Sequence, residues 1–122
     1  MPSTVLIVDD HPSFRATARM LLEADGWHVV GEAATGADAL TQARALHPHL
    51  VLLDVNLPDT DGFAVAAELC GAPRNGTPPP AIVLVSSREA RDFGPRVTAC
   101  GAAGFVSKAD LSGDALREVL VP

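Results

Sequence analysis

An uninterrupted apolar run that ends on a carboxylate constrains the fold more than any other part of this sequence. The run, Leu50 to Leu53, is followed directly by Asp54 and then by a segment rich in aspartate, proline and glycine. Four apolar residues without alternation are typical of a strand buried on both faces, as in a parallel sheet. The sequence therefore predicts a central strand with Asp54 at its carboxyl end. An isolated aspartate at such a position more often binds loop amides than takes part in chemistry, so its role depends on the other strands.

Short apolar runs alternate with helix-like segments along the whole chain. The predicted strands are residues 4–8, 27–34, 50–53, 81–85 and 104–107, and the predicted helices are residues 12–25, 36–46, 62–70, 88–100 and 111–120. Gly94-Pro95 is expected to interrupt the fourth helix, and residues 71–80 to form an extended surface connection. Because parallel strands require crossovers, the alternation predicts the α/β class, as a three-layer, doubly wound parallel sheet of five strands. The less apolar second strand is expected at a sheet edge.

The length and charge of the chain exclude several classes of function. At 122 residues the chain is long enough for one hydrophobic core and too short for two, so we expect one domain, residues 1–122. Its net charge of -6 argues against direct binding of nucleic acid by this domain. The sequence has no apolar segment near ~18 residues and no signal peptide, which predicts a cytoplasmic protein without a membrane partner. Cys70 and Cys100 are expected to be buried, reduced thiols.

Polar side chains follow the predicted strands where each one ends. They are Asp9 and Asp10 after the first strand, Asp54 after the third, Ser86 and Ser87 after the fourth, and Lys108 after the fifth. Ligands of open parallel sheets bind outside these carboxyl ends. Three clustered carboxylates favour a bound divalent cation, which with the lysine ammonium would balance their charge. Oxygen ligands favour Mg2+ over Zn2+, and the four histidines show no ligand spacing and are expected to be surface or structural residues.

A Mg2+ ion beside a carboxylate, a hydroxyl and an ammonium is suited to phosphoryl transfer, with the carboxylate as nucleophile. Two other functions remain open on the residues alone. One is a Mg2+-dependent phosphohydrolase with an aspartyl-phosphate intermediate. The other is an interaction module that works without phosphorylation.

Four segments carry a resemblance to a known family. They are residues 8–12 (VDDHP), residues 53–58 (LDVNLP) with Asp61-Gly62, residues 85–87 (VSS) and residues 101–108 (GAAGFVSK). Together they resemble the CheY-like receiver domains of bacterial two-component response regulators, and most closely the subgroup that precedes LuxR/NarL-type helix-turn-helix output domains. The resemblance implies a flavodoxin-like (βα)5 fold with strand order 2-1-3-4-5. It also implies a phosphorelay role with a sensor histidine kinase as partner.

The resemblance assigns a role to each polar strand end. Asp54 would be the phosphoacceptor and would also face the Mg2+ ion. Asp10 would bind the ion directly, Asp9 would act through or beside a metal-bound water, and Asn56 would contribute its backbone carbonyl. Lys108 would pair with the phosphoryl oxygens. On this basis the chain is a signalling switch that catalyses only its own phosphotransfer and slow dephosphorylation.

The resemblance also implies how the signal leaves the site. Ser86 would hydrogen-bond the new phosphoryl group and draw the following loop inward, and Phe105 would then turn inward. The face around the last two strands and their helices would control a partner, a homodimer, or transcription through a separate or removed DNA-binding domain. The chain departs from the family at Ala109, where many receivers carry a proline, often with a cis bond, and at the Gly94-Pro95 break.

Overall fold

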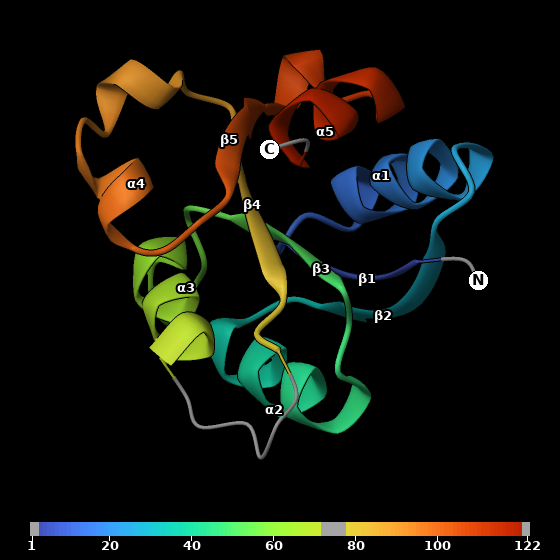
Figure 1. Ribbon diagram of the computed structural model, residues 1–122, viewed down its shortest axis with the longest axis horizontal. Coiled ribbons are helices and arrows are strands. Elements are labelled where there is room, and N and C mark those ends of the chain that lie inside the picture. The colour runs from blue at the N-terminus through green and yellow to red at the C-terminus, as the bar shows by residue number, and fades with distance from the viewer. Residues whose placement is uncertain (1–2, 72–77, 121–122) are drawn as a thin grey trace.

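The computed structural model describes residues 3–71 and 78–120, which form one parallel sheet covered by helices (Figure 1). The strands are β1 (Thr4–Val8), β2 (His28–Ala33), β3 (Leu50–Asp54), β4 (Ala81–Ser86) and β5 (Gly104–Ser107). The α-helices are α1 (Pro12–Ala24), α2 (Gly36–Leu46), α3 (Gly62–Gly71), α4 (Arg96–Ala99) and α5 (Gly113–Leu120), with 3-10 helices at Ala90–Asp92 and Lys108–Asp110. The strand order is β2-β1-β3-β4-β5, which confirms the predicted α/β class and flavodoxin-like order. Among the described residues, no helix is both long and apolar enough to cross a membrane.

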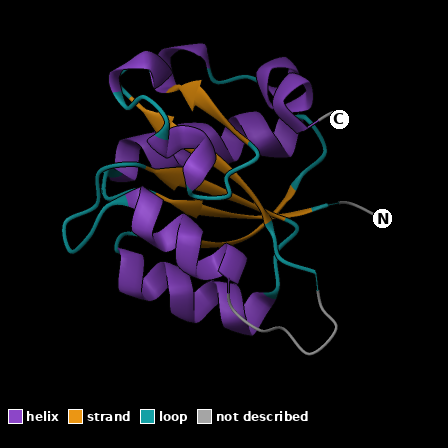
Figure 2. Ribbon diagram, turned by 60° about the vertical axis from the view of Figure 1, so that its left-hand side comes forward, coloured by secondary structure: helices purple, strands orange, loops and turns teal. Residues whose placement is uncertain are grey.

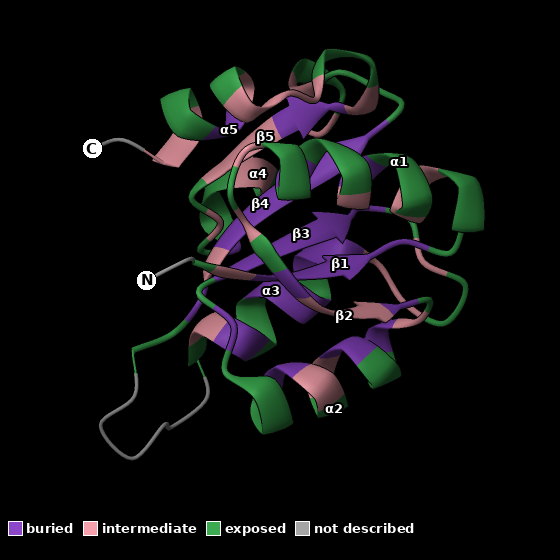
Figure 3. Cartoon of the chain, turned by 90° about the vertical axis from the view of Figure 1, so that its right-hand side faces the viewer, coloured by how far each residue is buried: buried purple, intermediate pink, exposed green. Residues whose placement is uncertain are grey.

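Both faces of the sheet are buried, which explains why its strands lack alternation (Figure 3). On one face the strand side chains pack against α2, α3 and α4, and on the other they pack against α1 and α5 (Figure 2). In β3, for example, Leu53 belongs to the first cluster and Leu52 to the second, and both are fully buried. Each such side chain stabilises the fold by about 1.5–3 kcal/mol. The two apolar layers therefore fix the direction of every strand end.

The fourth crossover is broken, as the sequence predicted. Gly94 has a φ of 61°, in the left-handed region that glycine adopts without strain. The helix α4 consequently spans only Arg96–Ala99, preceded by the 3-10 turn Ala90–Asp92. The Lys108–Ala109 peptide is trans, since the described residues contain no cis bond.

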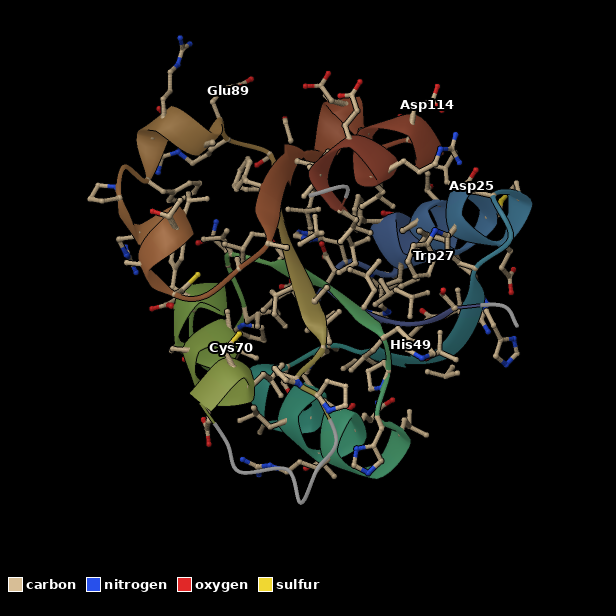
Figure 4. All side chains as sticks on the ribbon, viewed as in Figure 1. Asp25, Trp27, His49, Cys70, Glu89 and Asp114 are labelled. Carbon is tan, nitrogen blue, oxygen red and sulfur yellow. The ribbon has the colours of Figure 1, made fainter. Side chains whose placement is uncertain are left out.

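One predicted helix start and one predicted burial are wrong. The last helix begins at Gly113 and not at Leu111, because a 3-10 turn follows β5 and the Ser112 hydroxyl then accepts a hydrogen bond from the Ala115 N–H at 3.0 Å. Cys100 is buried as predicted, but Cys70 is only partly buried, and its thiol donates to the Gly101 carbonyl at 3.5 Å (Figure 4). Residues 72–77 of the predicted extended connection lie outside the described residues.

Two helices on the same face are tied together near their ends. Arg117 of α5 pairs with Asp25, which follows α1, and with Asp114 on its own helix. Figure 4 shows Asp25 and Asp114 near each other at this junction. The ion pairs are exposed, so they orient the two helices more than they stabilise them.

Gly62 allows α3 to start directly against the end of β3. Its N–H donates to the Val55 carbonyl at 2.7 Å, and a Cβ at this position would collide with the carbonyl oxygen of Asp54 and lie 3.0 Å from Val55 Cα. These obstacles are backbone atoms, which cannot rotate away. The close approach therefore holds the end of β3, which carries Asp54.

Replacing Gly62 with alanine is expected to destabilise the protein by about 1–3 kcal/mol, because the methyl group forces the backbone of β3 and α3 apart. Gly71→Ala, at the other end of the same helix, is the matched control, because a Cβ there meets no atom within 4 Å. Urea unfolding of the two variants measures the difference. Equal stability of the two variants would contradict the predicted clash.

Candidate functional site

One ammonium group joins residues from three strands at the carboxyl edge of the sheet. Lys108, which follows β5, places its Nζ 2.6 Å from Oδ2 of Asp9 and 3.4 Å from Oδ2 of Asp54. Asp9 follows β1, and Asp54 is the last residue of β3. Because β1, β3 and β4 are consecutive in the sheet and β5 lies beside β4, these ends converge. The structure thus brings together three of the predicted site residues.

The two aspartates are buried and respond differently to their surroundings. Burial and the negative charge of Asp9 raise the pKa of Asp54 to about 6, although Lys108 and a hydrogen bond from the Asn56 N–H partly offset this. Burial alone would also raise the pKa of Asp9, but the Lys108 ammonium and hydrogen bonds from His11 hold it below its usual range. Asp9 therefore stays ionised, while Asp54 is mainly ionised only above pH 6.

Asp10 and His11, the two residues that follow Asp9, extend the acidic cluster to the surface. The His11 Nδ1 atom lies 2.9 Å from Oδ1 of Asp9 and 3.1 Å from Oδ1 of Asp10. One ligand atom from each of Asp9, Asp10, His11 and Asp54 lies within 4.8 Å of the others. His11 is exposed, as expected, but the spacing of the histidines along the sequence did not indicate that its ring would lie beside the strand-end acids. Its position directly after the strand-end acids is the signal that would have identified it.

The donor atoms of this cluster fit a divalent cation. Oδ2 of Asp9 is fully buried, and among the described residues the Lys108 ammonium, 2.6 Å away, is its one partner. Carboxylate oxygens are the ligands that Mg2+ prefers. Asp10 is exposed, so the cluster is open to solvent on one side. Asn56 lies beside Asp54, to whose Oδ1 its N–H donates at 3.3 Å.

Ser86 and Phe105 lie on the neighbouring strands β4 and β5. Ser86 is fully buried at the end of β4, and its hydroxyl accepts a hydrogen bond from the Arg88 N–H at 3.1 Å. Phe105 is half-buried on β5, with its ring 5.8 Å from that of Phe93, which in turn lies 5.5 Å from Phe63. Ser86 therefore anchors the start of the loop after β4, and the rings connect this loop to β5 and α3.

Arg15 is a site residue that the sequence did not reveal. From α1, its Nη1 donates to the backbone carbonyl of Asp9 at 2.6 Å, and its Nε donates to Glu32 of β2 at 3.0 Å. Glu32 also binds Arg19 at 2.6 Å. This network fixes the turn after β1. Helical spacing places Arg15 on a polar face but does not indicate that the side chain reaches back to the strand end.

Replacing Asp54 with asparagine is expected to stabilise the metal-free protein at pH 8 by roughly 1–3 kcal/mol. An acid with a raised pKa binds its proton more tightly in the folded state, so ionisation of Asp54 destabilises the fold as the pH rises from about 4 through 6. The difference between the variant and the unmodified protein should therefore vanish below about pH 4.

Urea unfolding between pH 4 and 8 measures this effect. Asp110→Asn, which removes an exposed acid from the turn after β5, is the matched control and should show no such dependence. A destabilised Asp54→Asn protein at pH 8 would contradict the proposed cost of the buried charge.

The sequence is similar to known bacterial regulators over most of its length. The profile of the response regulator receiver domain family matches residues 5–120. The virulence-factor transcription regulator BvgA of Bordetella pertussis is 42% identical over 108 residues, which cover 88% of this chain and 50% of BvgA. The response regulator GacA of Pseudomonas protegens is 38% identical over 105 residues, which cover 85% of this chain and 47% of GacA. The chain thus spans about half the length of these relatives.

The fold is similar to solved receiver structures. The signal receiver domain of NarL from Mycobacterium tuberculosis superposes with a TM-score of 0.81 at 32% identity, covering 97% of this chain and 96% of that one. The chemotaxis response regulator CheY4 of Vibrio cholerae gives a TM-score of 0.82 at 25% identity, with coverages of 98% and 100%. The predicted resemblance is thereby confirmed, and the chain belongs to the response regulator receiver domain family of two-component systems.

Proposed function

We propose that this receiver is a phosphorylation-activated switch that accepts a phosphoryl group on Asp54 from the phosphohistidine of a sensor histidine kinase. The observation that carries the proposal is the position of Asp54, whose carboxylate lies 3.4 Å from the Lys108 ammonium. With a pKa of about 6, this carboxylate is mainly ionised at pH 7.5 and can act as a nucleophile. The family to which the chain belongs supports the same role.

The acidic cluster would hold the Mg2+ ion that this chemistry requires. Asp9, Asp10 and Asp54 would provide carboxylates, and Asn56 its backbone carbonyl. When bound, the ion supplies positive charge that neutralises the phosphoryl oxygens. The ligand atoms of Asp9, Asp10 and Asp54, which lie within 4.8 Å of one another, support this assignment. The residue Arg15 keeps the turn that carries the first two acids in place.

The transfer is a single displacement at phosphorus. A carboxylate oxygen of Asp54 attacks, the bond between phosphorus and the kinase histidine nitrogen breaks, and the electron pair leaves with the imidazole. Lys108 faces the oxygens on which negative charge accumulates and can donate hydrogen bonds to them. Water later hydrolyses the acyl phosphate slowly, so the chain returns to its first state without acting on another substrate.

The new group changes the hydrogen bonds of the neighbouring strand. The Ser86 hydroxyl, which now accepts from the Arg88 N–H, would donate to a phosphoryl oxygen and draw the following loop inward. The ring of Phe105 would then turn inward. Its present contact with Phe93, on the loop that moves, supports a linked rearrangement. The face formed by β4, α4, β5 and α5 is the surface that would change.

We propose that the output is control of transcription in the cytoplasm. The relatives BvgA and GacA are named as a transcription regulator and a response regulator, and each extends well beyond the region that this chain matches. The DNA-binding function would therefore belong to a separate domain. A homodimer formed through the switching face is a further expected partner.

Incubation with Mg2+ and acetyl phosphate is expected to add one phosphoryl group, detected by intact-protein mass spectrometry. Asp54→Asn should abolish the mass increase, as should removal of Mg2+ with a chelator. Asp59→Asn, which changes an exposed acid in the loop after β3, is the matched control and should still be modified. A phosphoryl group retained by Asp54→Asn would overturn the assignment.

Ser86→Ala is expected to accept the phosphoryl group but to lose the structural response, because the hydroxyl that would reach the phosphate is absent. Amide chemical shifts of the loop after β4 and of Phe105, recorded with and without phosphorylation, measure that response. Ser87→Ala removes an exposed hydroxyl one residue later and should respond normally. If phosphorylation shifts these amides as much in Ser86→Ala as in the unmodified protein, the switch role of Ser86 is refuted.

A further inference from the structure

An aromatic ring lies against the ammonium group that joins the strand ends. The Nζ atom of Lys108 lies over the ring of Phe14, 4.5 Å from the ring centroid. The face of an aromatic ring carries partial negative charge and attracts a cation within about 6 Å of the centroid. The ammonium therefore has a third partner besides the carboxylates of Asp9 and Asp54, and this partner carries no net charge.

The fold holds this ring in place. Phe14 lies in the first turn of α1, where Pro12 fixes the start of the helix, and its side chain packs against the apolar cluster that α1 and α5 cover. The ammonium of Lys108, by contrast, ends a flexible four-carbon stem. A packed ring consequently restricts a cation that its own stem leaves free to move.

The two carboxylates alone do not place the ammonium against the proposed phosphoacceptor. The nitrogen is 2.6 Å from Asp9 but 3.4 Å from Asp54, so it lies closer to the acid that is not modified. The ring attracts the ammonium without neutralising it, and only 18% of the Lys108 side chain is accessible to solvent. A cation shielded from water interacts more strongly with nearby negative charge than a hydrated one does.

We propose that Phe14 is a positioning residue for the phosphoryl transfer, whose ring holds the Lys108 ammonium between the strand ends through a cation–π interaction. The cation is then in place when negative charge accumulates on a phosphoryl group at Asp54. This inference rests on the proposed function for the group that Lys108 faces. An aliphatic side chain at position 14 would fill the same space but would not attract the cation, so the two kinds of side chain should behave differently.

Side-chain 13C relaxation of the metal-free protein tests the contact without any phosphorylation. Phe14→Leu should lower the order parameter of the Lys108 ε-carbon, whereas Phe14→Tyr, which keeps the ring face, should leave it at the value of the unmodified protein. Trp27→Leu is the matched control, because it removes a partly buried ring that packs against the same apolar cluster beyond the far end of α1 (Figure 4). An unchanged order parameter in Phe14→Leu, or an equal decrease in Trp27→Leu, would overturn the proposal.

The rate of phosphorylation by acetyl phosphate at saturating Mg2+ tests the consequence. Phe14→Leu should react about two- to fivefold more slowly than Phe14→Tyr, which is the effect of one cation–π interaction at a partly exposed site. Phenylalanines with one, two and three ring fluorines at position 14 keep the shape of the side chain but weaken the negative face of the ring, so the rate should fall in that order. Equal rates across this series would overturn the proposal. If the unmodified protein takes up no phosphoryl group, the proposed function fails, and the relaxation measurement still decides whether Phe14 holds Lys108.

Discussion

The contact of one lysine ammonium with two buried carboxylates is the interaction on which the rest of the site depends. Lys108 reaches Asp9 at 2.6 Å and Asp54 at 3.4 Å, although these residues end three different strands. Buried charges cost free energy unless they are paired, and one cation cannot fully compensate two anions. The fold therefore holds an excess of negative charge at one edge of its sheet. Burial, together with the negative charge of Asp9, raises the pKa of Asp54, and the excess charge provides a place for a divalent cation.

The surrounding structure makes this arrangement rigid where the chemistry requires it. The strands β1 and β3 are buried between two apolar layers, and Gly62 lets α3 pack against the backbone at Asp54. Arg15 fixes the carbonyl of Asp9 from α1 and is held in turn by Glu32 of β2. These contacts are short and partly buried, so they oppose movement of the two acids towards or away from each other. The free energy of apolar burial thus offsets the cost of burying the incompletely paired charges of the site.

The strand ends were predictable from sequence because a parallel sheet places them at one edge whatever the helices do. The positions of Asp9, Asp54 and Lys108 could be predicted from the apolar runs that precede them. The break at Gly94 could be predicted from the backbone preferences of glycine and proline. Arg15 and His11 were not identified, because helical periodicity says which face a side chain occupies but not how far it reaches. The start of α5 was misplaced for a similar local reason, since Ser112 caps the helix after an intervening 3-10 turn.

The segment that would respond to phosphorylation is also the least stabilised one around the site. From Ser87 to Ala99, all of whose residues are described, every residue is exposed or only partly buried. Phe93 and Val97 pack against the core from this segment, and Arg96 lies over the Phe63 ring at 4.3 Å. Few buried contacts mean a low free energy for local rearrangement. The segment begins beside the buried Ser86 hydroxyl. One new hydrogen bond made by this hydroxyl would therefore act on the part of the structure that rearranges at the lowest free-energy cost.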